Sequence, residues 1–320
     1  MISPQETSSP DSAEPPQPQA VAWVAARRRL PAWLVLGGLI VAATLPLRTW
    51  IIQSAPAGDA LYDDRDRGGC LVVAGGGRLT ESVMRTFVER AGGRTAKIIV
   101  IPGGEIEQRH RDNYLAEWKR AGAAEVRILH THSREEADRP EFSACLEAAT
   151  GVWLGGGDQN WHSSLYANTL VEQRLKDVLA RDGVVGGVSA GASVMTRVMM
   201  AGGKGEPVQG QGFDLFPGAV VDQHFLKRNR LSRLLSLLER NPDLVGFGVD
   251  EGTALVVRVR DWNLKVVGDS YVMAVVPATE SRKLRLEVLK PGDEIDLAGL
   301  HDPDAQVTSA EDLDSVLSGG

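Results

Sequence analysis

Residues 183–195 read GVVGGVSAGASVM, and the architecture of the chain can be inferred outward from them. An apolar, β-branched run leads into Ser189, a glycine lies two residues to either side of it, and a helix-forming run, residues 192–200, follows. This G-x-S-x-G pattern between a strand and a helix predicts a nucleophile elbow, a tight turn that requires glycine two residues to either side of the serine. The elbow would hold the serine hydroxyl at the end of a sheet, where it can attack a carbonyl carbon. The alternative is an ordinary glycine-rich turn in which Ser189 caps a helix.

Four similar strand-turn-helix units precede the elbow. Their apolar runs are residues 70–74, 97–101, 126–129 and 151–154, and an amphipathic run with helical spacing follows each of them. Strands that alternate with helices in this way predict an α/β fold, with a mostly parallel sheet and helices on both faces. In such sheets ligands bind at the carboxyl ends of the strands, where the glycine-rich turns lie.

The pattern changes after the elbow. Residues 246–257, 264–278 and 284–289 have the composition of strands without intervening helices. We therefore expect an antiparallel extension at the C-terminal end of the domain.

The composition is that of a globular, mildly acidic protein without a metal centre or cofactor. The 320 residues carry a net charge of −7, and the arginines are dispersed, so nucleic acid is not an expected partner. Cys70 and Cys145 lie in apolar contexts and form no CxxC pair. His130 and His132 are expected on opposite faces of a strand end, with no third ligand nearby.

The N-terminal part of the chain predicts export. Residues 1–29 are rich in Pro, Ser and Gln, which indicates a disordered tail that ends in an arginine triplet. Residues 30–52 then form an apolar run close to the length that spans a hydrocarbon core of roughly 30 Å. We favour a transmembrane anchor or uncleaved signal here over a secretory signal cut near residues 55–57. The arginines predict that the following domain lies on the periplasmic or extracellular side, or is secreted after cleavage.

Two further segments are expected outside the folded domain. Residues 53–67 would be a linker, and the acidic residues 301–320 a flexible tail.

His224 is the best-placed base for Ser189. A serine hydroxyl is a poor nucleophile until a base takes its proton and donors stabilise the oxyanion. His224 follows an apolar run and begins a polar cluster before a helix, whereas the other histidines lie before the elbow or in the C-terminal tail. The backbone N–H of Ala190 is one expected oxyanion donor, and the turn containing Gly156 and Gly157 is the best source of a second.

Four sequence blocks resemble the signature blocks of the cyanophycinases, which are serine peptidases related to dipeptidase E with a fold like that of class I glutamine amidotransferases. The blocks are GGGDQ at 155–159, GVSAGA at 187–192, DQHF at 222–225 with the arginines that follow it, and GVDEGTA at 248–254. They occur in order over about residues 68–280, and the resemblance implies a serine hydrolase domain over residues 68–300.

The resemblance also implies roles for individual residues. Ser189 would be the nucleophile and His224 the base. The positions that would shape the substrate pocket are Gln159, Asp222, Gln223, Arg228, Arg230 and Arg233. For the third member of the triad we predict Glu206, because acidic residues are sparse between Ser189 and His224; Asp222 and Asp250 are the alternatives.

The reaction implied by the resemblance is hydrolysis of cyanophycin, a polyaspartate with arginine on each β-carboxyl, to β-aspartyl-arginine dipeptides. The pocket arginines would bind substrate carboxylates, and Asp158 or Asp222 would bind the guanidinium. The expected partners are therefore a peptide substrate and, through residues 30–52, a membrane; a homodimer is compatible with the sequence.

Three alternatives compete with this interpretation. A dipeptidase E-like exopeptidase for other aspartyl peptides would use the same catalytic residues. An α/β-hydrolase esterase would need a late base such as His301. A membrane-tethered binding protein would retain the site without turnover.

Overall fold

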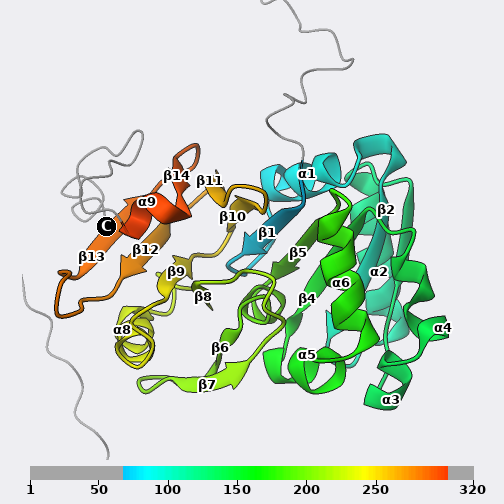
Figure 1. Ribbon diagram of the computed structural model, residues 1–320. Coiled ribbons are helices and arrows are strands. Elements are labelled where there is room, and N and C mark those ends of the chain that lie inside the picture. The colour runs from blue at the N-terminus through cyan, green and yellow to red at the C-terminus, as the bar shows by residue number, and fades with distance from the viewer. Residues whose placement is uncertain (1–67, 302–320) are drawn as a thin grey trace, which may run out of the picture. The chain divides into compact units, whose positions relative to one another are not determined.

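The computed structural model describes residues 68–301 (Figure 1). The predicted tail 1–29, anchor 30–52 and linker 53–67 lie outside the described residues, as does the predicted C-terminal tail beyond residue 301. From residue 68 to residue 301, no helix combines the length and the apolar character needed to cross a membrane.

The main sheet confirms the predicted α/β architecture. Its strand order is β14-β11-β10-β1-β5-β4-β2-β3. The central strands pair in parallel and are β1 (Cys70–Ala74), β5 (Val184–Val188), β4 (Gly151–Gly157), β2 (Lys97–Gly103) and β3 (Glu125–Ile128). The antiparallel strands that extend the sheet beyond β1 are β10 (Thr253–Arg258), β11 (Asn263–Gly268) and β14 (Glu294–Asp296).

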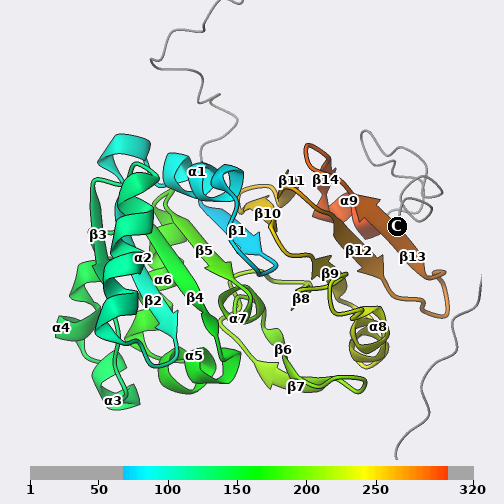
Figure 2. The ribbon, with the colours of Figure 1, turned by 180° about the vertical axis from the view of Figure 1, so that it is seen from behind.

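Helices cover both faces of this sheet (Figures 1 and 2). On one face, α1 (Glu81–Arg90) and α2 (Gln108–Arg120) pack with Val72 and Ile98 of the strands. On the other face, α5 (Gln159–Tyr166) and α6 (Leu170–Ala180) pack with Leu71, Val73 and Ile99. Adjacent strand residues thus enter opposite core layers, because successive side chains of a strand point to opposite faces. Between β3 and β4 lie the short helices α3 (Arg134–Ala137) and α4 (Pro140–Ser143) and a 3-10 turn at Ala144–Leu146.

A second sheet follows the elbow. Its order is β13-β12-β9-β8, with β8 (Ala219–Gln223), β9 (Val245–Val249), β12 (Val272–Val276) and β13 (Arg285–Leu289). The helix α8 (Leu231–Glu239) connects β8 to β9, which pair in parallel, and the other pairs are antiparallel. The last described element is the short helix α9 (Leu297–His301).

Two expectations for this region are wrong. Residues 246–257 do not form one strand, because the chain turns at Gly252, where φ is +69°, and passes from β9 of the second sheet to β10 of the main sheet. Residues 264–278 divide in the same way between β11 and β12.

The helix predicted over residues 192–200 is also shorter than expected. The helix α7 spans Ala190–Ser193, and the chain then enters the hairpin of β6 (Val198–Gly202) and β7 (Val208–Gln211). The carbonyls of Val194 and Met195 accept hydrogen bonds from Phe213 and Leu215, so the returning chain replaces the next helical turn.

Candidate active site

Ser189 lies in the predicted elbow between β5 and α7. Its backbone has φ 54° and ψ −110°, a strained conformation for a residue with a side chain. The two flanking glycines are required by close contacts of the backbone. A Cβ on Gly187 would lie 2.5 Å from the carbonyl oxygen of Gly191, and one on Gly191 would lie 2.1 Å from that of Leu154.

His224 faces the serine from the end of β8. Its Nε2 is 2.9 Å from Oγ of Ser189, and its side chain is 11% exposed. The backbone N–H of His224 donates to the carbonyl of Gly75 in the turn after β1. A Cβ on Gly76 in that turn would lie 2.3 Å from Cε1 of the imidazole, so only glycine leaves room for the ring. No sequence motif assigns Gly76 to the site, although it belongs to the glycine run 75–77 at the end of a predicted strand.

Glu251 holds the other side of the imidazole. Its Oε1 is 2.6 Å from Nδ1 of His224. Because a carboxylate can only accept, Nδ1–H donates to Glu251, and Nε2 is left to accept the hydroxyl proton of Ser189. The three side chains therefore have the hydrogen-bond geometry of a nucleophile, a base and a group that orients the base.

The prediction that Glu206 orients His224 is wrong. Glu206 lies between β6 and β7, with a side chain 81% exposed, and pairs with Arg240 at 2.8 Å. The alternatives have other partners as well: Asp222 binds Arg233, and Asp250 accepts from the N–H of Lys227 and from Ser270.

Topology explains the position of Glu251. His224 directly follows β8 and Glu251 comes two residues after β9, and these neighbouring strands run parallel. Their carboxyl ends meet at one edge of the second sheet, although 27 residues separate the two side chains in the sequence. The block GVDEGTA, which contains Glu251, was the available signal.

The structure brings two of the three predicted oxyanion residues to the serine. Ala190 is the first residue of α7, so the helix leaves its N–H without an internal partner. A Cβ on Gly156 would lie 3.7 Å from Cβ of Ser189. Gly157 packs instead against β2, where its Cβ would lie 2.2 Å from the carbonyl oxygen of Gly103.

His162 fixes the turn that contains Gly156. The imidazole is fully buried, and Nε2 lies 2.9 Å from the carbonyl oxygen of Gly155. In a planar trans peptide the carbonyl of Gly155 and the N–H of Gly156 point in opposite directions, so this hydrogen bond also sets the direction of the Gly156 N–H. Burial lowers the pKa of His162 to about 4, so at neutral pH the uncharged ring donates from Nε2.

The predicted pocket residues form a buried network beside His224. Asp222 is fully buried and binds Arg233 through both carboxylate oxygens, at 2.7 and 2.5 Å, and Arg230 at 3.4 Å. Burial raises the pKa of Asp222, while the two arginines oppose the shift. Arg230 also donates to the backbone and side chain of Gln223, and burial lowers its pKa to about 10, which leaves it charged at neutral pH.

Within the described part of the chain, the other predicted pocket residues make no hydrogen bond to the side chains of this network. The side chain of Gln159 donates to the carbonyls of Met200 and Ala201, both at 2.9 Å. Asp158 caps α5 by accepting the N–H of Asn160, and Arg228 is exposed. Asp222 and Arg233 therefore bind each other, whereas the side chains of Asp158 and Arg228 are exposed to solvent.

A cavity of about 980 Å³ opens next to the elbow. It reaches Gly156 and Val188, which neighbour Ser189, and extends toward α1 and α2. Charged side chains of both signs line it: Arg78, Glu81, Arg85, Glu105, Glu117 and Arg120.

The expectation that His130 and His132 have no third ligand nearby is wrong. Glu105 follows β2, the neighbour of β3, and its carboxylate lies 3.1 Å from Nδ1 of His132. One potential ligand atom from each of the three residues lies within 4.8 Å of the others.

The chain resembles characterised proteins over most of the described region. Residues 71–265 match the model of the family described as peptidase family S51. A cyanophycinase from Nostoc sp. (strain PCC 7120) is 34% identical over 239 residues, which cover 67% of this chain and 80% of that protein. A cyanophycinase from Synechococcus elongatus is 32% identical over 273 residues, which cover 77% and 84%. The crystal structure of a peptidase from an acI-B1 actinobacterium superposes with a TM-score of 0.54 at 25% identity, covering 72% of this chain and 98% of the other.

Proposed function

The chain belongs to peptidase family S51, and from this premise we propose that it hydrolyses aspartyl peptide bonds in cyanophycin or in related β-aspartyl peptides. It is a hydrolase of the serine peptidase class, similar to the cyanophycinases. The observation that carries the proposal is the hydrogen-bond chain from Ser189 through His224 to Glu251.

In the proposed reaction, Oγ of Ser189 attacks the carbonyl carbon of the scissile amide. Nε2 of His224 takes the hydroxyl proton as the Ser189–substrate bond forms, and then gives it to the leaving amine. Water, deprotonated by the same nitrogen, attacks the acyl-enzyme and releases the second product. Glu251 keeps the proton on Nδ1 and stabilises the imidazolium that forms at each step.

The oxyanion would be held by the N–H groups of Ala190 and Gly156. The position of Ala190 at the start of α7 and the closeness of Gly156 to Ser189 support this assignment. Two such donors are typical of elbow hydrolases, and removal of one donor lowers kcat by about 10²–10³-fold.

The charged lining of the cavity beside the elbow favours a substrate that carries both positive and negative groups. Each repeat of cyanophycin has a backbone bond between aspartates and a guanidinium at the tip of its side chain. Glu81 and Glu117 offer carboxylates for guanidinium groups, and exposed Arg228, outside the lining of the cavity, offers a cation for the terminal carboxylate. Exposed Asp158 offers a further carboxylate outside the lining of the cavity, whereas Asp222 is neutralised by Arg233 and is better suited to hold the strand end beside His224.

The test is release of β-aspartyl-arginine from purified cyanophycin by the protein and by its Ser189→Ala variant. We expect dipeptide release by the unmodified chain and none above background by the variant. A panel of other β-aspartyl dipeptides and N-terminal aspartyl dipeptides runs in parallel. Activity on the dipeptides alone would support the dipeptidase E-like alternative, and a folded protein inert on all of them would contradict the proposal.

We also propose that residues 30–52 anchor the protein in a membrane, with the catalytic domain on the periplasmic or extracellular side. The support is the apolar run preceded by an arginine triplet. In this location the enzyme would act on polymer or peptides outside the cytoplasm.

A further inference from the structure

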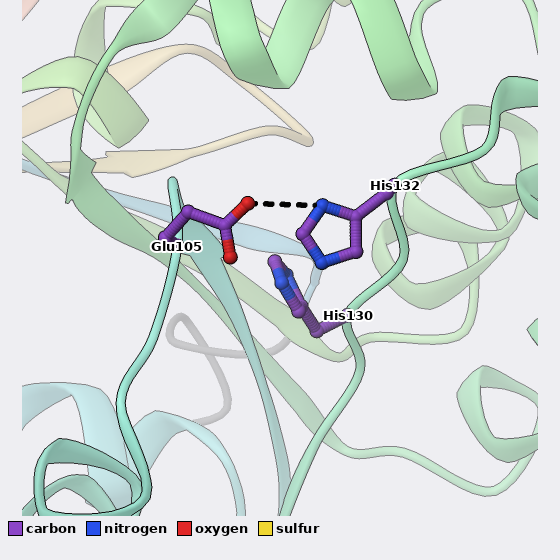
Figure 3. A group of neighbouring side chains, drawn as sticks. All are labelled: Glu105, His130 and His132. Carbon is purple, nitrogen blue, oxygen red and sulfur yellow. Dashed lines mark ion pairs between the residues drawn. The ribbon is translucent and has the colours of Figure 1, made fainter.

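A cluster of two histidines and one glutamate lies apart from the serine and its partners, at the carboxyl ends of β2 and β3. Glu105 comes two residues after β2 ends, and His130 and His132 come two and four residues after β3 ends. Because β2 and β3 are parallel neighbours, the loops that follow them leave the same edge of the sheet. Figure 3 shows the carboxylate and the two imidazoles directed toward one another from these two loops.

The chemistry of the cluster matches a transition-metal site. Two imidazoles and one carboxylate are the ligand set of several catalytic zinc centres, and imidazole is a preferred ligand of the borderline metals. The candidate ligand atoms lie within 4.8 Å of one another. Ligands of a tetrahedral ion at about 2.0–2.1 Å would be about 3.3 Å apart, so the side chains would have to close by up to about 1.5 Å. Glu105 and His132 have the freedom to do so, since their side chains are 72% and 60% exposed.

A second observation comes from His130, which has an unpaired polar atom. Nδ1 of His130 is buried and has no hydrogen-bond partner among the described residues. Buried polar atoms are usually paired, so this unpaired imidazole nitrogen, beside another histidine and a carboxylate, is available to bind a ligand.

The indole of Trp161 supports both imidazoles. The ring of His130 stacks on it with an interplanar angle of 11° and a centroid distance of 6.1 Å. The ring of His132 meets the same indole edge-on at 87° and 5.6 Å. Trp161 follows the GGGDQ block on α5, and its stacking orients the half-buried ring of His130, toward which the exposed side chains can move.

We propose that Glu105, His130 and His132 bind a divalent transition-metal ion of the zinc class. The site goes beyond the proposed peptidase function, in which Ser189 attacks without a metal. Three protein ligands leave at least one coordination position for water or another donor. Since Glu105 also lines the 980 Å³ cavity, the ion would lie at the rim of that cavity and would tie the loops after β2 and β3 together.

The test is calorimetric titration of the full chain with zinc chloride, after removal of any purification tag and dialysis against a chelator. We expect one ion per chain in the unmodified protein and in Ser189→Ala. Each of Glu105→Gln and His132→Ala should weaken binding by at least about tenfold, because even outer-shell substitutions at metal sites cost 10–100-fold. Both side chains are exposed, so these variants should fold, and His130→Ala provides a third measurement.

Glu107→Gln is the matched control, since it removes the same charge two residues further along the loop. It should bind zinc like the unmodified protein. Zinc should also quench or shift the fluorescence of Trp161, and a Trp161→Phe variant identifies that part of the signal. Absence of zinc binding in the unmodified protein would overturn the proposal, and so would binding that keeps its full affinity in both Glu105→Gln and His132→Ala. Neither result depends on whether the chain cleaves cyanophycin.

Discussion

At the scale of single residues, Glu251 sets the tautomer of His224, because its carboxylate determines which ring nitrogen carries the proton. We predict that Glu251→Gln lowers kcat by about 10⁴-fold, the loss seen when the acidic residue of a serine triad is replaced. KM should change little, because Glu251 does not contact the substrate in the proposed reaction. Steady-state kinetics on cyanophycin measures both quantities.

Glu206→Gln is the control for this substitution. Glu206 is exposed and pairs with Arg240 on the hairpin side of the domain, so its replacement should leave kcat within about twofold. A loss of activity in Glu206→Gln that equals the loss in Glu251→Gln would contradict the assignment.

The lowered pKa of His162 predicts that the free energy of unfolding depends on pH. Its pKa is about 4 in the folded protein and about 6.5 in an unfolded chain, so the unfolded state binds the proton first as the pH falls. The folded state therefore loses stability between pH 6.5 and pH 4, by up to about 3 kcal/mol for the full shift of this one group. Above pH 6.5 the ring is neutral in both states and contributes no slope.

Urea unfolding at pH 7 and pH 4.5 measures this effect in the unmodified protein and in His162→Gln, which retains a donor for Gly155. From pH 7 to pH 4.5 the free energy of unfolding should fall in both proteins. The fall should be about 2–3 kcal/mol smaller in the variant than in the unmodified protein. Exposed His132→Ala should keep the dependence of the unmodified protein. Identical pH dependence in all three proteins would show that His162 does not titrate as described.

The sequence identified most residues of the site but not how they are held. Ser189, Ala190 and Gly156 follow from the elbow and from one glycine-rich turn, both of which are local patterns. Glu251 could not be found by local reasoning, since its contact with His224 depends on the parallel pairing of β8 and β9. Proximity in sequence favoured Glu206, which the fold carries away from the imidazole.

Among the elements, the turn after β1 positions the base as directly as the elbow positions the nucleophile. We predict that Gly76→Ala lowers kcat by about tenfold or more while the domain stays folded, because a Cβ there would lie 2.3 Å from the His224 ring. Gly205→Ala, where a Cβ would meet nothing within 4 Å, is the control. Circular dichroism verifies the fold, and unchanged kcat in a folded Gly76→Ala protein would contradict the role of this turn.

The strands that were predicted correctly are those with clear local boundaries. The parallel strands 70–74, 97–101 and 151–154 are short apolar runs that end in glycine turns, and all three form as expected. The long strand expected over residues 246–257 failed because a sheet change at Gly252 leaves the apolar pattern nearly continuous. This change is functionally important, since it brings Glu251 to the point where the two sheets meet.

At the scale of the whole molecule, the chain combines a catalytic domain with an apolar N-terminal segment. We predict that the full chain remains in the membrane pellet after alkaline carbonate extraction, because residues 30–52 would span the hydrocarbon core. A chain that lacks residues 1–52 should appear in the supernatant. Protease added to spheroplasts, whose outer face of the inner membrane is accessible, should digest the catalytic domain if the arginine triplet orients the anchor as proposed.

Two outcomes of the fractionation would count against the anchor. One is the full-length chain in the soluble fraction. The other is a soluble chain whose N-terminus, determined by sequencing, lies near residues 55–57, which would support the secretory alternative.

The central claim is that Ser189 is the nucleophile of this peptidase, and covalent labelling tests it most directly. An organophosphonate fluoride transfers its phosphorus to an activated serine oxygen with loss of fluoride, and mass spectrometry of the digested protein locates the adduct. We predict one adduct per chain, on the peptide that contains Ser189, with labelling abolished in Ser189→Ala and strongly slowed in His224→Ala. An adduct on another residue, or cyanophycin hydrolysis that persists in Ser189→Ala, would contradict the account.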